Sequence, residues 1–408
     1  MKKRIFSLLL MSCMLFTACG TGPVATEPSE TPKPTETQAP TEQKPEPVDF
    51  KINGVDLEKF TIVWAESEYV LQQKLYPKYL PSKDMNEETA ERLQAFFLEK
   101  CGIKLDMISD KEKVNYKYEI YVGPVTKNDL YRQLLLGRQT EDDYRIAVVE
   151  NRMVICGGEC GTTWHALDYF EAQVEEQLKN NGKVSFENKY DYAGQYHLIK
   201  IGMVGDSITQ GSGSSTKDRG VLAHPNQIGR ILWKDCLVYN YGRAGRTMRE
   251  DHGDSYMAAS IYSEALQGAT KMDIMTIMLG TNDADRFFGA QGKWTDADDA
   301  QFIASCEKMV KSFYDKNNNL KFFLFNAPSC FRADSDYVAG IPDVREAQQA
   351  AYDHLKTKGY NMLGFLDVGE LTKDMKKYFS DGLHPNDPGH KLLAERIAEY
   401  LQVELLEK

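Results

Sequence analysis

The chain has 408 residues, of which 42% are hydrophobic and 27% are charged, which is enough for about two packed domains. Its formal net charge of −11 argues against nucleic acid or anionic lipid as the main partner. Beyond the N-terminus no apolar run approaches the roughly 20 residues that a membrane-spanning helix needs.

Residues 1–19 are typical of a bacterial export signal. Residues 2–4 are basic, and residues 5–16 form an apolar run that is too short to span a bilayer. The segment Leu-Phe-Thr-Ala-Cys, residues 15–19, resembles the lipobox of bacterial lipoproteins. This resemblance implies cleavage before Cys19 and lipidation of its thiol, which would attach the exported protein to the membrane at the cell surface. An ordinary signal peptide cleaved nearby is the alternative.

Residues 20–49 are rich in Pro, Thr and Glu, and their only larger apolar residues are Val24 and Val48. Such a segment cannot bury enough apolar surface to offset the entropy lost on ordering. We therefore expect a disordered and extended linker.

Residues 50–194 predict a smaller, mixed α/β domain. The pattern, which includes IYVG and later YRIAVVENRMVICGG, is similar to the small domain that precedes the catalytic domains of carbohydrate-active enzymes such as α-glucuronidases. That similarity implies an accessory domain, to which we assign no chemistry. The predicted elements are a helix over 86–102, a short strand of alternating character over 118–122, a hairpin of strands 144–149 and 153–156, and a helix over 161–178.

Residues 197–408 alternate between short apolar strands and helices, which predicts a parallel sheet with helices on both faces. In such sheets the reacting groups collect beyond the carboxyl ends of the strands. The predicted strands cover 199–204, 237–241, 273–279, 320–326 and 360–366, and helices are predicted over 298–316, 344–358 and 387–406.

A serine directly follows the first of these strands, in the motif Gly205-Asp206-Ser207. A tight turn at this point would project the hydroxyl at the rim of the sheet. Residues 209–215 that follow are small and polar, so the hydroxyl need not be buried. A turn serine or a helix cap is the alternative interpretation.

Two possible hydrogen-bond donors follow the next strands along the chain. Gly242 allows the backbone to approach a bound group closely, and Asn282 offers a side-chain amide, so both suit a developing oxyanion. Ordinary turns use the same residue types.

Asp381 and His384 lie three residues apart, just before the last predicted helix. A turn through Gly382 would let the carboxylate bind one imidazole nitrogen and leave the other free to accept a serine proton. A structural histidine is the alternative.

Together these motifs resemble the SGNH (GDSL-type) hydrolase family, over about residues 197–408. The family's four signature residues match Ser207, Gly242, Asn282 and His384, and Asp381 matches its acid. The resemblance implies a three-layer α/β/α, flavodoxin-like sandwich with a parallel sheet. It also implies an oxyanion hole made by the Ser207 and Gly242 N–H groups and the Asn282 amide, with no metal or cofactor.

The resemblance favours a serine esterase that removes small acyl groups, such as acetyl, from a carbohydrate or polysaccharide through an acyl-enzyme on Ser207. A lipase, lysophospholipase or thioesterase acting on longer acyl chains is a second possibility. A third is a non-catalytic, glycan-binding surface lipoprotein. An assay across acyl chain lengths would separate the three.

Three residues near the predicted rim of the sheet could contact the substrate. Arg243, Arg246 and Trp294 fall in or near loops at this rim and are candidates for binding a sugar or an acidic group. His390 is expected on the surface in the first turn of the last helix, with Asp387 as its N-cap.

Cys156 and Cys160 frame a short loop and allow either a disulfide or half of a metal site. No second pair with metal-ligand spacing accompanies them, so the sequence disfavours a metal. Separate buried thiols are the simpler interpretation.

Overall fold

The computed structural model describes residues 47–406, except residues 68, 128, 136–139, 217 and 334. The predicted signal segment, Cys19 and nearly all of the predicted linker lie outside the described residues. Within the described part of the chain, no helix combines the length and the apolar character required to cross a membrane.

The N-terminal lobe, residues 47–195, contains a six-stranded sheet in the order β4-β3-β5-β7-β6-β9 and a small sheet in the order β2-β1-β8. Strands β3, β4, β5 and β7 run parallel, whereas β6 is antiparallel to both of its neighbours. The strands are β1 (Phe50–Ile52), β2 (Val55–Asp56), β3 (Thr61–Trp64), β4 (Asp106–Ser109), β5 (Glu119–Val122), β6 (Asp143–Val149), β7 (Arg152–Gly157), β8 (Val184–Phe186) and β9 (Asp191–Gln195).

The long helices of this lobe follow the predicted hydrophobic spacing. Helices α2 (Met85–Cys101) and α4 (Cys160–Asn181) cover one face of the six-stranded sheet, and α3 (Leu130–Leu135) packs on the other. A shorter helix, α1 (Tyr69–Leu75), precedes α2. The hairpin of β6 and β7 is confirmed, and it turns at Glu150, whose φ is +53°.

Two features of the lobe differ from the sequence expectation. The strand predicted to alternate, β5, is buried at all four positions, because it lies between β3 and β7 with helices on both faces. Strands β1, β2, β3, β4, β8 and β9 were not predicted. All four residues of β3, Thr61–Trp64, are buried, so this strand shows no period-two pattern.

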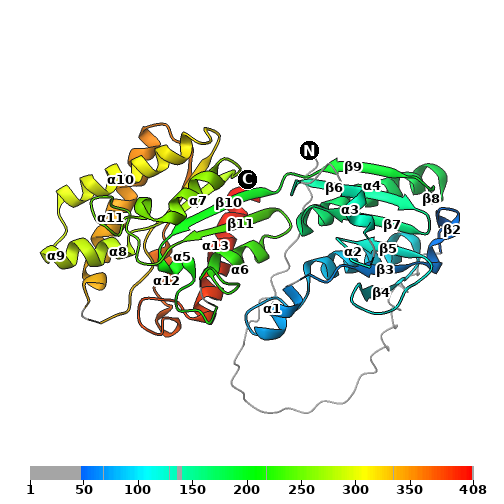
Figure 1. The fold of residues 1–408 in the computed structure, drawn as a ribbon, viewed down its shortest axis with the longest axis horizontal. Coiled ribbons are helices and arrows are strands. Elements are labelled where there is room, and N and C mark those ends of the chain that lie inside the picture. The colour runs from blue at the N-terminus through cyan, green and yellow to red at the C-terminus, as the bar shows by residue number, and fades with distance from the viewer. Residues whose placement is uncertain are drawn as a thin grey trace, which may run out of the picture. The chain divides into compact units, whose positions relative to one another are not determined.

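The C-terminal lobe, residues 199–406, has a fully parallel five-stranded sheet in the order β11-β10-β12-β13-β14 (Figure 1). Side chains alternate between its two faces: in β12, Ile274 and Met278 pack on one side, and Met275 and Ile277 on the other. The strands are β10 (Ile199–Gly205), β11 (Cys236–Gly242), β12 (Ile274–Met278), β13 (Lys321–Phe325) and β14 (Met362–Leu366), so all five predicted strands are confirmed.

Helices cover both faces of this sheet, which confirms the predicted three-layer α/β/α fold. Helices α7 (Ser260–Ala269), α10 (Asp296–Tyr314) and α11 (Asp336–Thr357) form one layer, and α6 (His224–Ile231), α12 (Val368–Thr372) and α13 (Asp387–Leu406) form the other. Short helices α5 (Ser207–Gln210), α8 (Thr281–Asp283) and α9 (Gly289–Gln291) lie in loops. The sequence predicted that α11 starts at residue 344, after Pro342. The helix instead starts at Asp336 and continues through this proline.

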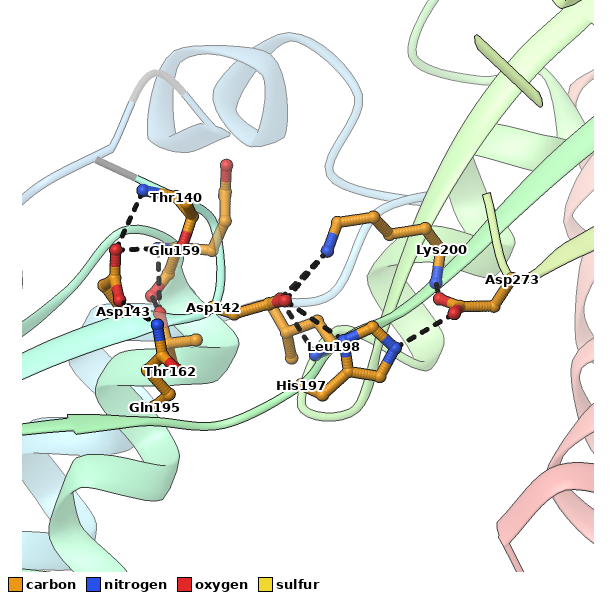
Figure 2. A network of polar contacts seen from close by, with 10 residues as sticks. All are labelled: Thr140, Asp142, Asp143, Glu159, Thr162, Gln195, His197, Leu198, Lys200 and Asp273. Carbon is orange, nitrogen blue, oxygen red and sulfur yellow. Dashed lines mark hydrogen bonds and ion pairs between the residues drawn. The ribbon is translucent and has the colours of Figure 1, made fainter. Parts of the chain in front are cut away.

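A shared carboxylate joins the two lobes. Asp142, just before β6, accepts hydrogen bonds from the Lys200 ammonium at 2.9 and 3.1 Å and from the Leu198 N–H at 3.1 Å (Figure 2). The His197 ring lies between Asp142 and Asp273, 3.0 Å from each carboxylate. Burial acts to raise the pKa of Asp142, but the hydrogen bonds from Lys200 and His197 outweigh it and lower the pKa.

We expect Asp142→Asn to lower the free energy of unfolding by about 1–3 kcal/mol, because it leaves the Lys200 ammonium, whose side chain is 9% exposed, without a carboxylate. Urea unfolding at pH 7 measures this change. Asp315→Asn is the matched control. It breaks an exposed ion pair with Lys311 at the C-terminal end of α10 and should change stability little. Equal effects of the two substitutions would contradict the prediction.

Candidate active site

The structure places Ser207 directly beyond the carboxyl end of β10. Asp206 caps the short helix α5 by accepting the Ile208 N–H at 2.9 Å, and Ser207 is the first helical residue. Its own N–H therefore belongs to the helix-terminal groups that have no partner inside the helix. Ser207 is only 8% exposed, less than the small loop residues suggested, because Thr209 and Gln210 behind it are buried as well.

Ser207, His384 and Asp381 form a continuous chain of hydrogen bonds. The Ser207 Oγ lies 3.0 Å from His384 Nε2, and His384 Nδ1 lies 2.7 Å from Asp381 Oδ2. Asp381 Oδ1 accepts the backbone N–H groups of Leu383 and His384 at 2.9 and 2.7 Å. The sequence placed these three side chains in one site, and the structure brings them within hydrogen-bond reach.

The environment of Asp381 keeps its carboxylate ionised. Burial acts to raise its pKa, but the hydrogen bonds from the His384 backbone and ring and from the Leu383 N–H outweigh it and lower the pKa to about 2. An ionised carboxylate orients the His384 ring through Nδ1, which leaves Nε2 available to accept the hydroxyl proton of Ser207.

The candidate oxyanion donors reach the same rim because the sheet is in register. Gly205 at the end of β10 pairs with Gly242 on one side and with Met278 on the other, and the loop after Met278 leads to Asn282. Asn282 is buried, and its Nδ2 donates one hydrogen bond to the Arg246 carbonyl at 3.0 Å. The second amide hydrogen is then left for a ligand.

Gly242 lies close to α5, the helix that begins with Ser207, and no other residue fits there. A Cβ atom at this position would come within 2.2 Å of the Gln210 backbone nitrogen. The Gly242 N–H donates to Asn240 Oδ1 at 2.9 Å, while Asn240 Nδ2 holds the Thr209 carbonyl at 2.9 Å. An oxyanion would have to share this N–H with Asn240, so its role as a donor stays a prediction.

Two buried carboxyl groups support the site. Asp206 belongs to the motif Gly205-Asp206-Ser207, and Asp283, for which the sequence predicted no role, directly follows Asn282. Asp283 accepts the backbone N–H groups of Met248 and Arg249 at 2.8 and 2.9 Å. Burial raises the pKa of both carboxyl groups to about 6.

The three candidates for substrate contact lie in different surroundings. Arg243 is exposed. Its backbone N–H donates to the Gly205 carbonyl at 2.9 Å, which places Arg243 beside the turn that leads to Ser207. Arg246 is half-buried and holds Asn282 through its carbonyl. Trp294 donates its indole N–H to Asp299 at 2.8 Å and packs on Phe302, so its visible contacts belong to α10. Substrate contact stays a prediction for all three.

The expectation for His390 is wrong. Its ring is fully buried, donates its Nε2–H to the Ser212 carbonyl at 3.0 Å, and stacks on the buried ring of His224. The cap of α13 is also different: Asn386 accepts the Gly389 N–H at 3.1 Å, whereas Asp387 holds the Ser215 backbone at 2.6 Å and its hydroxyl at 2.8 Å. The last helix therefore fixes the loop that follows Ser207.

Cys156 and Cys160 are free thiols, as are the other cysteines of the described residues. Burial raises the pKa of both thiols to about 12, so neither is a ready nucleophile. Among the described residues, no group of three or more His, Cys, Asp or Glu side chains is arranged to hold a metal ion.

Comparison with known proteins agrees with this geometry. Residues 203–392 match the family model of the GDSL-like Lipase/Acylhydrolase family. This part of the chain is a GDSL-type (SGNH) hydrolase domain. The match covers all five motif residues, from Ser207 to His384, and the family resemblance predicted from them is confirmed for this domain.

Two curated proteins resemble the GDSL-type domain. An acetylxylan esterase of Xylanibacter ruminicola is 28% identical over 214 residues, which are 49% of this chain and 42% of that protein. The GDSL lipase Rv0518 of Mycobacterium tuberculosis is 27% identical over 224 residues, which are 52% of this chain and 85% of that protein. The chain thus spans less than half the length of the acetylxylan esterase.

Among solved structures, the native aryl esterase of M. smegmatis is 19% identical and has a TM-score of 0.39. The matched region covers 51% of this chain and all of that one.

We expect acid to destabilise the fold through His390, since burial lowers the pKa of this ring to about 4. Between that value and the ordinary value of about 6.5, the unfolded chain binds a proton that the folded chain does not, so the free energy of unfolding falls as the pH falls. His390→Gln keeps an amide near Ser212 but removes the titration. Relative to the natural chain, it should gain about 2 kcal/mol of stability on going from pH 8 to pH 5.

Urea unfolding at the two pH values measures this difference. His390→Leu serves as the comparison: it loses the bond to Ser212 as well, so it should be less stable at both pH values yet gain by the same amount at pH 5. An unchanged difference between His390→Gln and the natural chain at the two pH values would contradict the prediction.

Proposed function

We propose that this protein is a serine esterase that hydrolyses small acyl esters, chiefly acetyl esters, on a carbohydrate or polysaccharide. The observation that carries the proposal is the hydrogen-bonded chain from Ser207 Oγ to His384 Nε2, at 3.0 Å, and from His384 Nδ1 to Asp381, at 2.7 Å. The similarity to an acetylxylan esterase supports the choice of an acetylated glycan as substrate.

In the proposed reaction, Ser207 Oγ attacks the ester carbonyl while His384 Nε2 accepts its proton. Asp381 stabilises the imidazolium that forms, and the developing oxyanion binds the Ser207 N–H and the Asn282 amide. The imidazolium then protonates the leaving alcohol, which leaves an acyl group on Ser207. His384 next removes a proton from water, and the attack of this water releases the carboxylic acid and restores the serine.

Residues 1–19 support an exported location with a lipid on Cys19, which would hold the enzyme at the cell surface near such a glycan. This location and the accessory role of the N-terminal lobe stay predictions from the sequence.

We expect the purified chain to hydrolyse p-nitrophenyl acetate faster than the butyrate and octanoate esters, and to release acetate from one of acetylated xylan, pectin, mannan or peptidoglycan. Ser207→Ala should lower kcat/KM by about 10⁴-fold or more. A rate that rises with chain length would instead identify a lipase or thioesterase, as the similarity to a GDSL lipase allows. Turnover that Ser207→Ala leaves unchanged, or no turnover at all, would point to a glycan-binding protein.

The proposed oxyanion site gives a second test. Asn282→Ala should lower kcat by about 10²–10³-fold and change KM less, because the donor acts on charge that develops in the transition state. Asn282→Asp keeps the shape of the side chain, but a carboxylate cannot donate, so the loss should be at least as large. Steady-state kinetics on p-nitrophenyl acetate measure both variants, and full activity of Asn282→Asp would exclude this role.

A further inference from the structure

The carboxylate of Asp381 has a third partner that no motif predicts. Arg332 Nη2 lies 3.3 Å from Asp381 Oδ2, and Arg332 Nε lies 3.4 Å from the Asp381 carbonyl oxygen. The same Oδ2 accepts the Nδ1–H of His384 at 2.7 Å. One carboxylate oxygen is therefore shared between the imidazole and a guanidinium.

The backbone holds Arg332 against this turn, so its position does not depend on a flexible side chain alone. The N–H of Phe331 donates to the Gly382 carbonyl at 2.7 Å. Gly382 has a φ of +77°, and a Cβ atom there would lie 2.8 Å from the backbone nitrogen of Arg332. The guanidinium also lies 5.5 Å from the ring centroid of Tyr337, at the start of α11.

The shared oxygen links Arg332 to the proton transfer. When His384 accepts a proton it becomes a second cation on the same carboxylate. Arg332 repels that cation, and it also competes for the oxygen that would stabilise it, so the protonated ring is less favoured than with Asp381 alone. The side chain of Arg332 is 40% exposed, so solvent and salt weaken this effect.

Other charged groups around His384 do not replace Arg332. Asp206, the buried cap of α5, faces the ring from the serine side, and the buried His390 faces it from α13. Neither contributes a cation to Asp381 Oδ2: Asp206 is a carboxyl group, and burial lowers the pKa of His390 to about 4, which favours the neutral ring. Arg332 is the cation that the described residues place on this oxygen.

We propose that Arg332 is a positioning residue of the site: it holds the Asp381 carboxylate that orients His384, and it competes with the ring for Asp381 Oδ2. The inference rests on the proposed esterase function for its kinetic readout. Arg332 need not touch the substrate in this role.

The test compares Arg332→Gln with the natural chain in kcat/KM against pH, using p-nitrophenyl acetate. The acid limb of the variant should move up by roughly 0.2–0.7 pH unit, the range that a partly exposed ion pair allows. Arg332→Lys keeps a cation at this position, so its acid limb should lie close to that of the natural chain. In 1 M salt the limb of the natural chain should approach that of Arg332→Gln, because salt screens the guanidinium.

Arg396→Gln is the matched control. Arg396, on α13, forms a comparable surface pair with Asp374, and its substitution should leave the acid limb unmoved. Titration of the His384 ring followed by NMR gives a readout that needs no turnover, so it separates failure of this inference from failure of the esterase proposal. The ring should titrate at higher pH in Arg332→Gln than in the natural chain. If the His384 ring titrates at the same pH in Arg332→Gln as in the natural chain, the inference is overturned. A rise in KM with no change in the acid limb would also overturn it and would make Arg332 a substrate contact.

Discussion

The candidate site depends on the register of β10 with its two neighbours. Gly205 pairs with Gly242 in β11 and with Met278 in β12, so three strands end at one level of the sheet. Gly242 ends its strand at this level, and the segments that follow the other two strands carry Ser207 and Asn282. A slip of one residue would exchange the side chains that pack on the two faces of the sheet, so the cores on both faces fix the positions of these groups. The remaining pair, Asp381 and His384, comes from outside the sheet and must be brought to this edge by α13.

The last helix is therefore the second constraint on the site. Its first turn holds the loop after Ser207 at two points: Asp387 binds Ser215, and His390 binds the Ser212 carbonyl. Ser212 in turn donates its N–H to the Ser207 carbonyl at 2.9 Å. The helix that directly follows His384 thus also fixes the loop after Ser207, so the distance between Ser207 and His384 is set by contacts at both ends.

Much of this arrangement follows from the sequence. The five strands of the C-terminal lobe are short apolar runs that alternate with helices, and this pattern is typical of parallel sheets. The spacing of Asp381 and His384 likewise predicts their contact, since both lie in one turn. What the sequence could not predict are contacts between distant segments: the burial of His390 against His224, the sharing of the Gly242 N–H with Asn240, and the approach of Arg332 to Asp381. Strand β3 was missed for a local reason, because a strand of four buried residues has no period of its own.

The bond between Asp142 and Lys200 has a consequence for any attempt to isolate the GDSL-type domain. Lys200 belongs to β10, the strand that leads to Ser207, and its side chain is 9% exposed. Cleavage between Gln195 and Ile199 would remove the carboxylate and uncover an ammonium at the opposite end of that strand from the serine. A shortened protein would thus begin with a charged residue in β10 and no counter-ion from its own sequence before it. The N-terminal lobe is in this sense a structural complement of the sheet, whatever else it binds.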